Sequence, residues 1–515
     1  MRRVVFLALL IVGLGLGLVG VAAEDGVLTV VTTTDPPRLD PAVITSYEAG
    51  MVTYNIYENL LTYDPTDFSI QPMLAETWEI AADGKSATFY LRQGVTFTDG
   101  TPFNAEAVKF NVERTVDLGL APATYLALIE EVEIIDEYTI QFRSSETWAF
   151  WEDAMATRKA LAIVSPTFVR EHATDEDPWA GEYLYDHTCG TGPYMLEEWV
   201  HGQYAKLVQN PEYWGGWEGE HFDTVFVRTV REPSVEELML KSGEADIAYE
   251  IPETHMAELD ARDDIFSQAL PGMAQMFFPI QSHDGSLADV RVRKAILYAL
   301  DLESIRTLFP GAGIAHGAIP TTMLGGDETA YTYPYDPEES KRLLASAGYE
   351  PGELSLTLVY IAGAEYQRRA ALVAQQNLAE VGVNLKVENM PWSTIFPLMA
   401  DPDQSPEIYM FYSAARFADP HGILYETFHS DALGPAGYNN GYSNPIFDQL
   451  LDQAEKTVDR DERAALYREA NQILINDAPA VFVWEMPYPF SYREDLKNVV
   501  PDVLFRTYDY YRMYR

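Results

Sequence analysis

The chain has 515 residues, and its 79 acidic residues against 35 lysines and arginines give a formal net charge of −44 at pH 7. This charge excludes nucleic-acid binding, because neutralising phosphates requires clusters of lysine and arginine. The length exceeds what one hydrophobic core organises, so two or three domains are expected. The single cysteine, Cys189, cannot form an internal disulfide and is expected to be a small buried side chain.

The first 23 residues have the pattern of an export signal. Arg2 and Arg3 precede an apolar run over 4–21, and Val21-Ala22-Ala23 fits a small-residue cleavage site. The apolar run is nearly long enough to span a bilayer, so an uncleaved anchor is the alternative. The residue after the cleavage point is Glu24 and not a cysteine that could carry a lipid. We therefore expect a free periplasmic protein.

An early stretch of the mature chain predicts a hairpin that leads into a helix. Apolar and polar side chains alternate from Ala87 to Arg92, which is the period of a half-buried strand. Asp83-Gly84 precedes this strand and Asp99-Gly100 closes the next one, and both are tight-turn sequences. Asn104 then favours the start of a helix, because its side chain can accept a hydrogen bond from the first turn.

Strands and helices alternate along the rest of the chain, without internal repeats, low-complexity tracts or a long linker. A strand is expected over 224–230, and Ser234 is expected to cap the helix that follows. The other expected elements are helices that begin at Asp289, Asp336-Pro337 and Asn444, a helix over 365–381, a strand over 383–387, and a helix through Leu466, Ile473 and Leu474. This alternation predicts an α/β fold.

Several stretches together resemble one protein family. The most informative begins at Asn55–Asp64 and continues through Pro72–Glu79, Ala82–Lys85 and Phe89–Asn104 to Glu113-Arg114. Later stretches follow in order, at Gly190–Tyr194, Asn210–Trp214, Val290–Asp301, Tyr335–Tyr349, Tyr442–Asp448 and Asn476–Pro479. They resemble the signatures of the family 5 extracellular solute-binding proteins, which are the receptors of ABC importers for peptides, nickel chelates, opines and some oligosaccharides. The resemblance covers nearly all of residues 25–515.

This resemblance implies an α/β, periplasmic binding protein-like bilobed fold of type II, cluster C-like, with an extra inserted domain. The expected boundaries are a signal peptide at 1–23, a lobe 1 α/β domain at 24–67, 191–277 and 489–515, an inserted domain of lobe 1 at 68–190, and a lobe 2 α/β domain at 278–488. Crossovers near Thr191–Pro193, 275–280 and 488–492 would form the hinge.

The implied function is capture and delivery of a solute. A peptide- or oligosaccharide-sized ligand would bind between the lobes, and closure would bury it and present it to the membrane permease of an ABC transporter. No cofactor and no metal are expected, the protein is not expected to be an enzyme, and it is expected to act as a monomer.

Catalytic patterns do not compete strongly with this interpretation. The sequence has no HExxH, Walker A, GxSxG or CxxC motif. Acidic neighbours such as Asp263 and Asp264 are typical of a solvated surface, and His421 alone is weak evidence for binding a metal chelate. A secreted hydrolase acting on a similar polymer-derived ligand is the alternative, since two carboxylates ~5–10 Å apart would suffice for a glycosidase. A surface chaperone or adhesin that uses an open cleft is a third possibility.

The stretch Tyr409–Pro420 is the candidate ligand segment, a strand followed by a loop. Family members that bind peptides carry an acid here that pairs with the ligand's α-amine. Arg416 occupies the dipeptide-type position of that acid, whereas Asp419 is near the oligopeptide-type position. Dipeptide receptors also have an arginine for the ligand carboxylate in a loop where this chain has Ile361 to Gly363. Both departures predict that dipeptides are not the ligand.

Two ligand chemistries therefore remain open. In the first, Arg416 would hold a carboxylate or phosphate of the ligand. The simpler role for Arg416 is an ion pair with an acidic side chain at the surface. Alternatively, an uncharged site would stack sugars on aromatic side chains. Tyr412, in the candidate segment, and Trp392, just after a strand, are the aromatic candidates, although Trp392 also suits a purely structural role. Tyr47 and Thr33 belong to the N-terminal region that approaches the ligand in this family.

We expect the free energy of unfolding to increase with salt, because mobile ions screen the repulsion among the excess acidic side chains. Urea denaturation in dilute buffer and at about 1 M NaCl, where the Debye length is ~3 Å, measures the effect. Stability that is highest in dilute buffer and decreases as NaCl is added would contradict this expectation.

Overall fold

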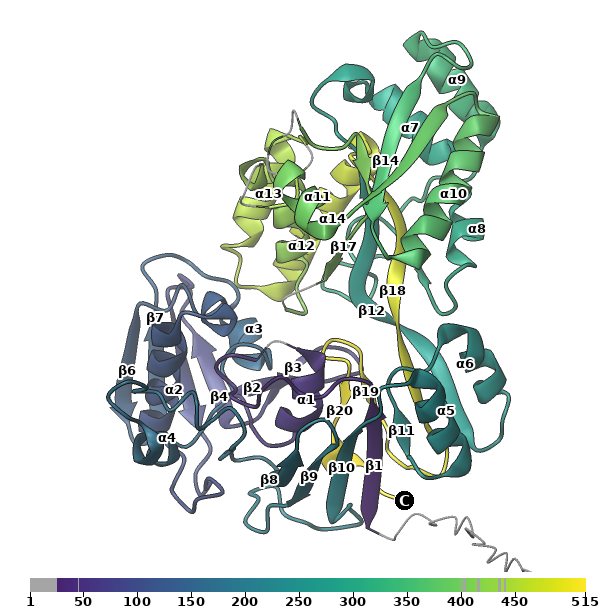
Figure 1. Ribbon diagram of the computed structural model, residues 1–515. Helices are drawn as coiled ribbons and strands as arrows, with labels where there is room; N and C mark the ends of the chain where they lie inside the picture. The colour runs from purple at the N-terminus through teal and green to yellow at the C-terminus, as the bar shows by residue number, and fades with distance from the viewer. Residues whose placement is uncertain are drawn as a thin grey trace, which may run out of the picture.

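The structure is a computed structural model that describes residues 26–44, 46–399, 401, 404–414, 417–433, 437–439 and 441–515. The expected signal peptide, residues 1–23, lies outside the described residues. Two lobes lie one above the other in Figure 1, with lobe 1 below and lobe 2 above. Two long antiparallel strands, β12 (Ile265–Pro279) and β18 (Ala480–Arg493), run from one lobe into the other.

The main sheet extends through both lobes in the order β17-β12-β18-β11-β1-β10-β9-β8. In lobe 1, β1 pairs in parallel with both β10 and β11, while β8 and β9 form an antiparallel edge. The elements of this part are β1 (Val27–Thr32), α1 (Tyr47–Thr53), β8 (Tyr194–Val200), β9 (Tyr204–Gln209), β10 (Thr224–Thr229), α5 (Pro233–Ser242), β11 (Ile247–Ala248), α6 (Glu253–Asp260), β19 (Pro501–Asp502) and β20 (Thr507–Tyr508).

One helix start in lobe 1 differs from the prediction. Helix α5 begins at Pro233 after the N-cap residue Glu232, and not after a cap at Ser234. Proline suits the first helical position, because its fixed φ matches the helix and its missing N–H has no partner there in any case. Gly243 ends the helix in the left-handed conformation.

A four-stranded antiparallel sheet, in the order β4-β5-β7-β6, forms the separate unit at the left of lobe 1 in Figure 1. The side chain of Asn104 accepts a hydrogen bond from the N–H of Ala107 at 3.1 Å, which confirms the predicted cap of α2. The buried Cys189 is also as predicted. The elements of this region are β2 (Leu61–Tyr63), β3 (Ile70–Pro72), β4 (Ala75–Ile80), β5 (Ser86–Leu91), α2 (Ala105–Leu118), β6 (Glu131–Asp136), β7 (Thr139–Arg143), α3 (Trp151–Ala156) and α4 (Pro166–His172).

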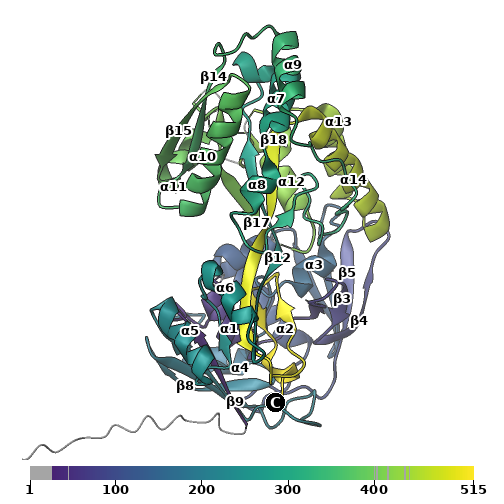
Figure 2. The same ribbon diagram turned by 90° about the vertical axis from the view of Figure 1, so that its right-hand side faces the viewer.

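Lobe 2 packs helices around the parallel sheet β15-β14-β16 and the upper halves of β12 and β18 (Figure 2). Asp289, Asp336 and Asn444 cap helices as predicted. The elements are α7 (Val290–Ala299), α8 (Leu302–Arg306), β13 (Gly313–Ile314), α9 (Pro337–Ala347), β14 (Ser355–Ile361), α10 (Glu365–Glu380), β15 (Asn384–Met390), α11 (Trp392–Met399), β16 (Ile408–Tyr409), β17 (Phe411–Ala414), α12 (His421–Phe428), α13 (Pro445–Ala454) and α14 (Arg460–Asp477).

The ladder between β12 and β18 is interrupted between the lobes. Its register shifts between Pro271, which lies opposite Pro487, and Gln275. Proline has no N–H to donate, so this part of the ladder is intrinsically weak. The interruption lies a few residues before the crossover predicted at 275–280. At Thr191–Pro193, the third predicted crossover, the N–H of Gly192 donates to the carbonyl of Ile56 in lobe 1.

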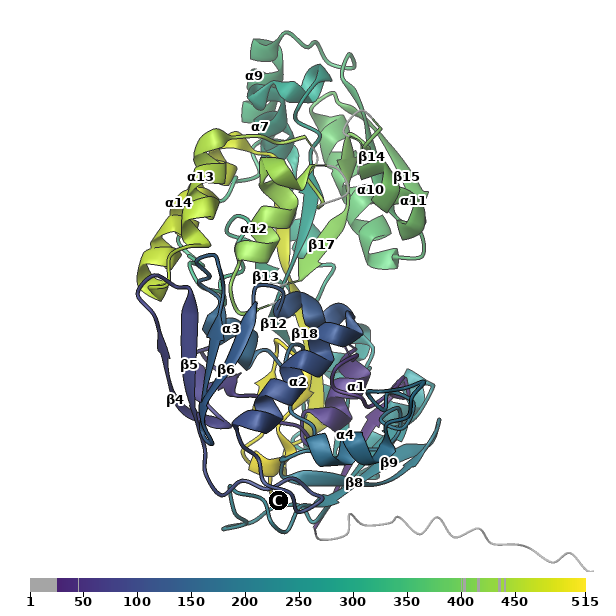
Figure 3. The ribbon, with the colours of Figure 1, turned by 90° about the vertical axis from the view of Figure 1, so that its left-hand side faces the viewer.

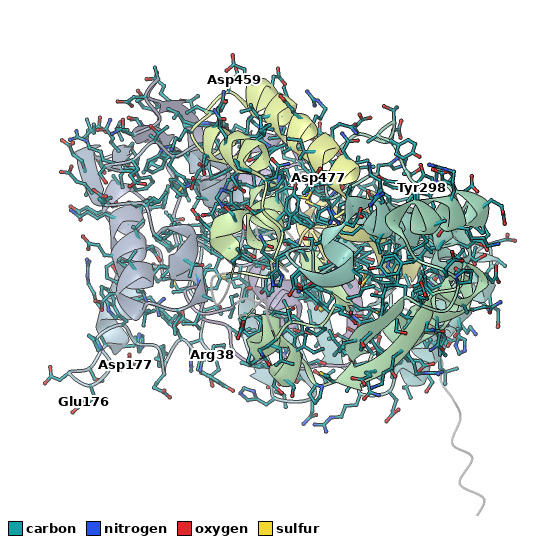
Figure 4. All side chains as sticks on the ribbon, turned by 90° about the horizontal axis from the view of Figure 1, so that it is seen from above. Arg38, Glu176, Asp177, Tyr298, Asp459 and Asp477 are labelled. Atoms are coloured by element: carbon teal, nitrogen blue, oxygen red, sulfur yellow. The ribbon has the colours of Figure 1, made fainter. Side chains whose placement is uncertain are left out.

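A second connection between the lobes is a buried ionic network, which we define as Asp153, Arg460, Arg463 and Asp419. The Arg463 guanidinium lies 3.6 Å from the Asp153 carboxylate of α3 and donates to Asp419 in lobe 2 at 3.0 Å. The side chains of Arg463, Asp153 and Asp419 are all 0% exposed. Arg460 pairs with Asp153 at 3.2 Å. Figure 3 shows the start of α14 beside the inserted sheet, and α14 can be followed in Figure 4 between the labelled Asp459 and Asp477.

Replacing Arg463 with methionine should destabilise the protein by about 3–5 kcal/mol, because two buried carboxylates would lose their shared cation. The shift of the urea midpoint measures this loss. Arg468→Met is the matched control, because Arg468 is exposed on the same helix and should change stability by only about 0.5 kcal/mol. Equal, small losses in both variants would show that the network does not stabilise the fold.

Candidate ligand site between the lobes

A cavity of about 560 Å³ lies at the lower end of lobe 2, where β14, α10, α11 and β17 meet. We call it the aromatic cavity. Its volume is within the usual range for a small-molecule site. Its lining residues are Ile361, Ala364, Tyr366, Trp392, Phe411, Tyr412, Ser413, Ala414, Glu426 and Tyr438. Two of the predicted ligand residues, Trp392 and Tyr412, are therefore brought together here.

The aromatic side chains of this cavity have different surroundings. Phe411 is buried and stacks on Trp392 with 5.9 Å between ring centroids, and the Tyr438 ring lies 4.5 Å from Phe411. Tyr412, the next residue of β17, points the other way and is 47% exposed. This is the alternation of a strand with one face in the core. Trp392 is partly buried, so it both supports the cavity wall and lines it.

Gly363 lies in the loop between β14 and α10, between the lining residues Ile361 and Ala364. Its φ is +90°, which favours glycine, and a Cβ atom there would meet nothing within 4 Å. The loop from Ile361 to Ala364 contains no charged residue. It contributes shape and backbone groups to the cavity wall, and not a cation for a ligand carboxylate.

Asp419 is not placed to meet a ligand in this arrangement. Its carboxylate is 0% exposed, accepts from Arg463, and also accepts from the Tyr467 hydroxyl at 2.7 Å. Asp419 was predicted to pair with a ligand amine. In the structure its carboxylate has a structural role instead, because it pairs with Arg463, which is distant in the sequence. Arg416, the other predicted charged residue, lies outside the described residues.

His421 is partly buried and packs against an aromatic side chain of lobe 1. Its ring lies 5.2 Å from that of Phe150, and burial lowers its pKa to about 4. Among the described residues, no group of three or more histidine, cysteine, aspartate or glutamate side chains could hold a metal ion. Likewise, no helix in the described part of the chain is long and apolar enough to cross a membrane.

On the lobe 1 side, Tyr47 is the first residue of α1. The Lys159 ammonium lies 5.1 Å from the centroid of its ring, and the Arg506 guanidinium lies 5.0 Å from the same centroid. Arg506 also lies over Tyr488, at 4.9 Å. The pattern of the sequence did not identify Lys159, Arg506 or Tyr488, because these residues are far apart in the chain and each stands in an unremarkable local context.

Thr33 follows β1, and its N–H donates to the Glu250 carboxylate at 3.0 Å. Glu250 follows β11, so both residues lie at the carboxyl ends of parallel strands, where α/β sheets commonly bind ligands. Glu236 accepts from the N–H of Glu250 at 3.0 Å. Burial, and then the charge of Glu250, raise the pKa of Glu236 to about 8.

Tyr488 connects the two sides. It lies on β18 opposite Leu270, beside the interruption of the ladder, and the ring of Tyr488 leaves no room for a Cβ atom at Gly272. Burial raises its pKa, and the neighbouring Tyr47 and Tyr412 raise it further. Tyr47 of lobe 1, Tyr488 of the crossover and Tyr412 of lobe 2 thus form a series of tyrosines between the lobes.

A larger cavity, of about 680 Å³, lies elsewhere. Only residues of lobe 1 line it, including Thr29, Tyr204, Phe226 and Arg228. It covers a face of strands β1, β9 and β10 and contains none of the predicted ligand residues. Size alone therefore does not select the site, and the aromatic cavity is favoured because two of the predicted ligand residues, Trp392 and Tyr412, line it.

Residues 69–434 match the family described as bacterial extracellular solute-binding proteins, family 5 Middle. This range is well over half of the chain. The protein belongs to this family. The expected family and the expected bilobed α/β fold are thereby confirmed.

Similar proteins extend the match over nearly the whole chain. The probable D,D-dipeptide-binding periplasmic protein DdpA of Escherichia coli K12 is 30% identical over 93% of this chain and 92% of its own. The glutathione-binding protein GsiB of Pectobacterium atrosepticum is 28% identical over 94% and 93%, respectively. The unliganded open form of the periplasmic murein tripeptide-binding protein MppA matches with a TM-score of 0.83, at 21% identity, over 96% of this chain and 98% of its own.

Membership of this solute-binding family has direct consequences. The protein is the substrate-binding component of an ABC importer and, like the other members, is not an enzyme. The hydrolase alternative is therefore set aside. The similar proteins DdpA and MppA are periplasmic.

Tyr412→Ala and Phe411→Ala should separate binding from stability. Tyr412 is 47% exposed, so its loss should change stability by only about 0.5 kcal/mol while weakening ligand binding at least ~5-fold, as for an aromatic contact residue. Phe411 is 5% exposed, and its truncation should cost about 3–5 kcal/mol. Urea denaturation and calorimetric titration provide the two measurements. Unchanged affinity in Tyr412→Ala would exclude the aromatic cavity as the ligand site.

Proposed function

We propose that this solute-binding protein is a periplasmic receptor for peptide-class solutes, from dipeptides to short oligopeptides and glutathione-like molecules. The observation that carries the proposal is the similarity over almost the full length to a D,D-dipeptide-binding and a glutathione-binding protein. The aromatic cavity, with one exposed tyrosine and backbone groups around Gly363, would accept a side chain and part of a peptide backbone.

The finer expectations from the sequence are revised in this proposal. The similar proteins give no support to an oligosaccharide ligand, although the aromatic cavity would also suit stacking of a sugar ring. They also give no support to excluding dipeptides, because DdpA is described as a probable D,D-dipeptide-binding protein. The missing arginine at Ile361 to Gly363 thus concerns where a ligand carboxylate is held, and not whether the ligand has one.

The proposed mechanism is closure of the lobes on the ligand. A ligand that contacts the aromatic cavity of lobe 2 and the Tyr47 region of lobe 1 would bind the closed form better than the open one. Changing the population from 1:99 to 99:1 requires about 5.5 kcal/mol of differential affinity. The interrupted β12–β18 ladder would provide the flexible connection, and the buried ionic network would hold the opposite edge of the lobes together.

The expected domain boundaries form part of the proposal. The main domain of lobe 1 comprises 24–67, 191–277 and 489–515, the inserted domain 68–190, and lobe 2 residues 278–488. Cleavage after Ala23, a monomeric state and delivery to an ABC permease are also part of the proposal. Closure of a monomer around its ligand requires no second copy of the chain.

A thermal-shift screen of the mature protein from Glu24 tests the proposal. The panel contains di- to pentapeptides, D-alanyl-D-alanine and glutathione, with cello-oligosaccharides and nickel–histidine chelates as the competing classes. A peptide at 100-fold its Kd should add about 2.7 kcal/mol of stability and raise the Tm. A shift with sugars or nickel chelates but with no peptide would overturn the proposal. Mass spectrometry of the denatured protein detects a ligand that is already bound.

A further inference from the structure

Two half-buried cations of lobe 1, Arg506 and Lys159, lie against tyrosine rings. Arg506 contacts only the rings of Tyr47 and Tyr488, at 5.0 and 4.9 Å, and Lys159 contacts the ring of Tyr47 at 5.1 Å. Within the described part of the chain, neither makes a hydrogen bond, and neither lies within the 4.0 Å ion-pair distance of a carboxylate. We call Arg506 and Lys159 the cationic pair.

The cationic pair lies on the side of lobe 1 that faces lobe 2. Tyr47 begins α1, Lys159 follows α3, and Arg506 lies between β19 and β20. Figure 1 shows these elements at the top of lobe 1, below β17. Tyr488, the other ring below Arg506, lies on the crossover strand β18. A ligand between the lobes would therefore meet this pair.

The backbone holds Arg506 in an unfavourable conformation. Its φ is +50°, which is unusual for a residue with a side chain. The preceding turn is fixed by Asp502, whose carboxylate accepts from the N–H groups of Leu504 and Phe505, each at 3.0 Å. Strained conformations of this kind persist where the surrounding structure enforces them, and they concentrate at ligand sites.

The nearest acids are already occupied. Asp502 is used by the turn, and burial raises its pKa. Glu250 accepts from Thr33 and is coupled to Glu236, and Arg506 only partly offsets the effect of burial on the pKa of Glu250. Burial lowers the pKa of Lys159. The charge of Asp502 partly offsets this effect on Lys159. Among the described residues, however, no carboxylate lies within ion-pair distance of either half-buried cation, so an incoming anion could pair with both directly.

We propose that Arg506 and Lys159, positioned by Tyr47 and Tyr488, form a subsite on lobe 1 that binds a carboxylate of the peptide-class ligand. A guanidinium can donate two parallel hydrogen bonds to a carboxylate, and an ammonium adds a compact charge. This subsite replaces, from the opposite lobe, the cation that the Ile361 to Gly363 loop lacks. The proposal rests on the proposed function. It also explains how binding would link the lobes, because the carboxylate and the rest of the ligand would contact different lobes.

Pairs of peptides that differ in one carboxylate test the subsite by calorimetric titration at neutral pH and physiological salt. Trialanine and its C-terminal amide report on the terminal carboxylate. Ala-Glu-Ala amide and Ala-Gln-Ala amide report on a side-chain carboxylate. D-alanyl-D-alanine and its amide extend the first comparison to the ligand class named for DdpA. We expect the acid to bind at least ~10-fold more tightly than the amide in one of these comparisons.

Arg506→Gln and Lys159→Met should each reduce this preference to less than about threefold, while binding of the amide changes little. Arg368→Gln is the matched control, because it removes the same charge from an exposed pair with Glu365, and it should retain the full preference. Far-ultraviolet circular dichroism checks that each variant folds. The comparison of acid and amide peptides on the wild-type protein tests the subsite independently of the variants.

Three outcomes would count against the subsite. Equal affinity of acid and amide in the wild-type protein would overturn it while leaving the receptor function intact. A preference that survives in both variants would place the carboxylate elsewhere and would also overturn it. If no peptide of either series binds, the proposed peptide-class function fails, and the subsite fails with it.

Discussion

The shared burial of Arg463 between Asp153 and Asp419 is the interaction on which the arrangement of the lobes depends. These charges come from the inserted domain of lobe 1 and from lobe 2, and all three side chains are 0% exposed. Burying any one of these charges without its partners would cost free energy, because a buried charge is tolerated only when it is paired. Hydrogen bonds from the Tyr63 and Tyr467 hydroxyls complete the network. The lobes are therefore joined at this edge as well as through β12 and β18.

This network also explains why one ligand residue was misassigned from the sequence. Asp419 lies in a segment that the family uses for ligand recognition, but its partner Arg463 is 44 residues away. No local sequence pattern predicts that pairing. Arg506 and Lys159 were missed because the sequence does not reveal that, among the described residues, no carboxylate lies within ion-pair distance of either cation. Only a three-dimensional arrangement can show such an absence.

Elements with strong local signals were predicted well. Asn104, Asp289, Asp336 and Asn444 cap helices, because a cap depends only on the next few residues. The error at Ser234 was two residues and arose where Pro233 offered a better start. Trp392 and Tyr412 line the same cavity, and their role in ligand binding stays a prediction. The register shift after Pro271 was not predicted, because the register of two distant strands cannot be deduced from either strand alone.

The sheet that joins the lobes also constrains the order in which the chain can fold. Strand β1 pairs with β10 and β11, and β11 in turn pairs with Ser491 and Tyr492 of β18. Lobe 1 is therefore incomplete until almost the entire chain is available, whereas the parallel sheet of lobe 2 uses residues between Ser355 and Tyr409 only. Contacts of such long sequence separation form slowly. An emerging chain consequently remains partly unfolded until its last strands are released.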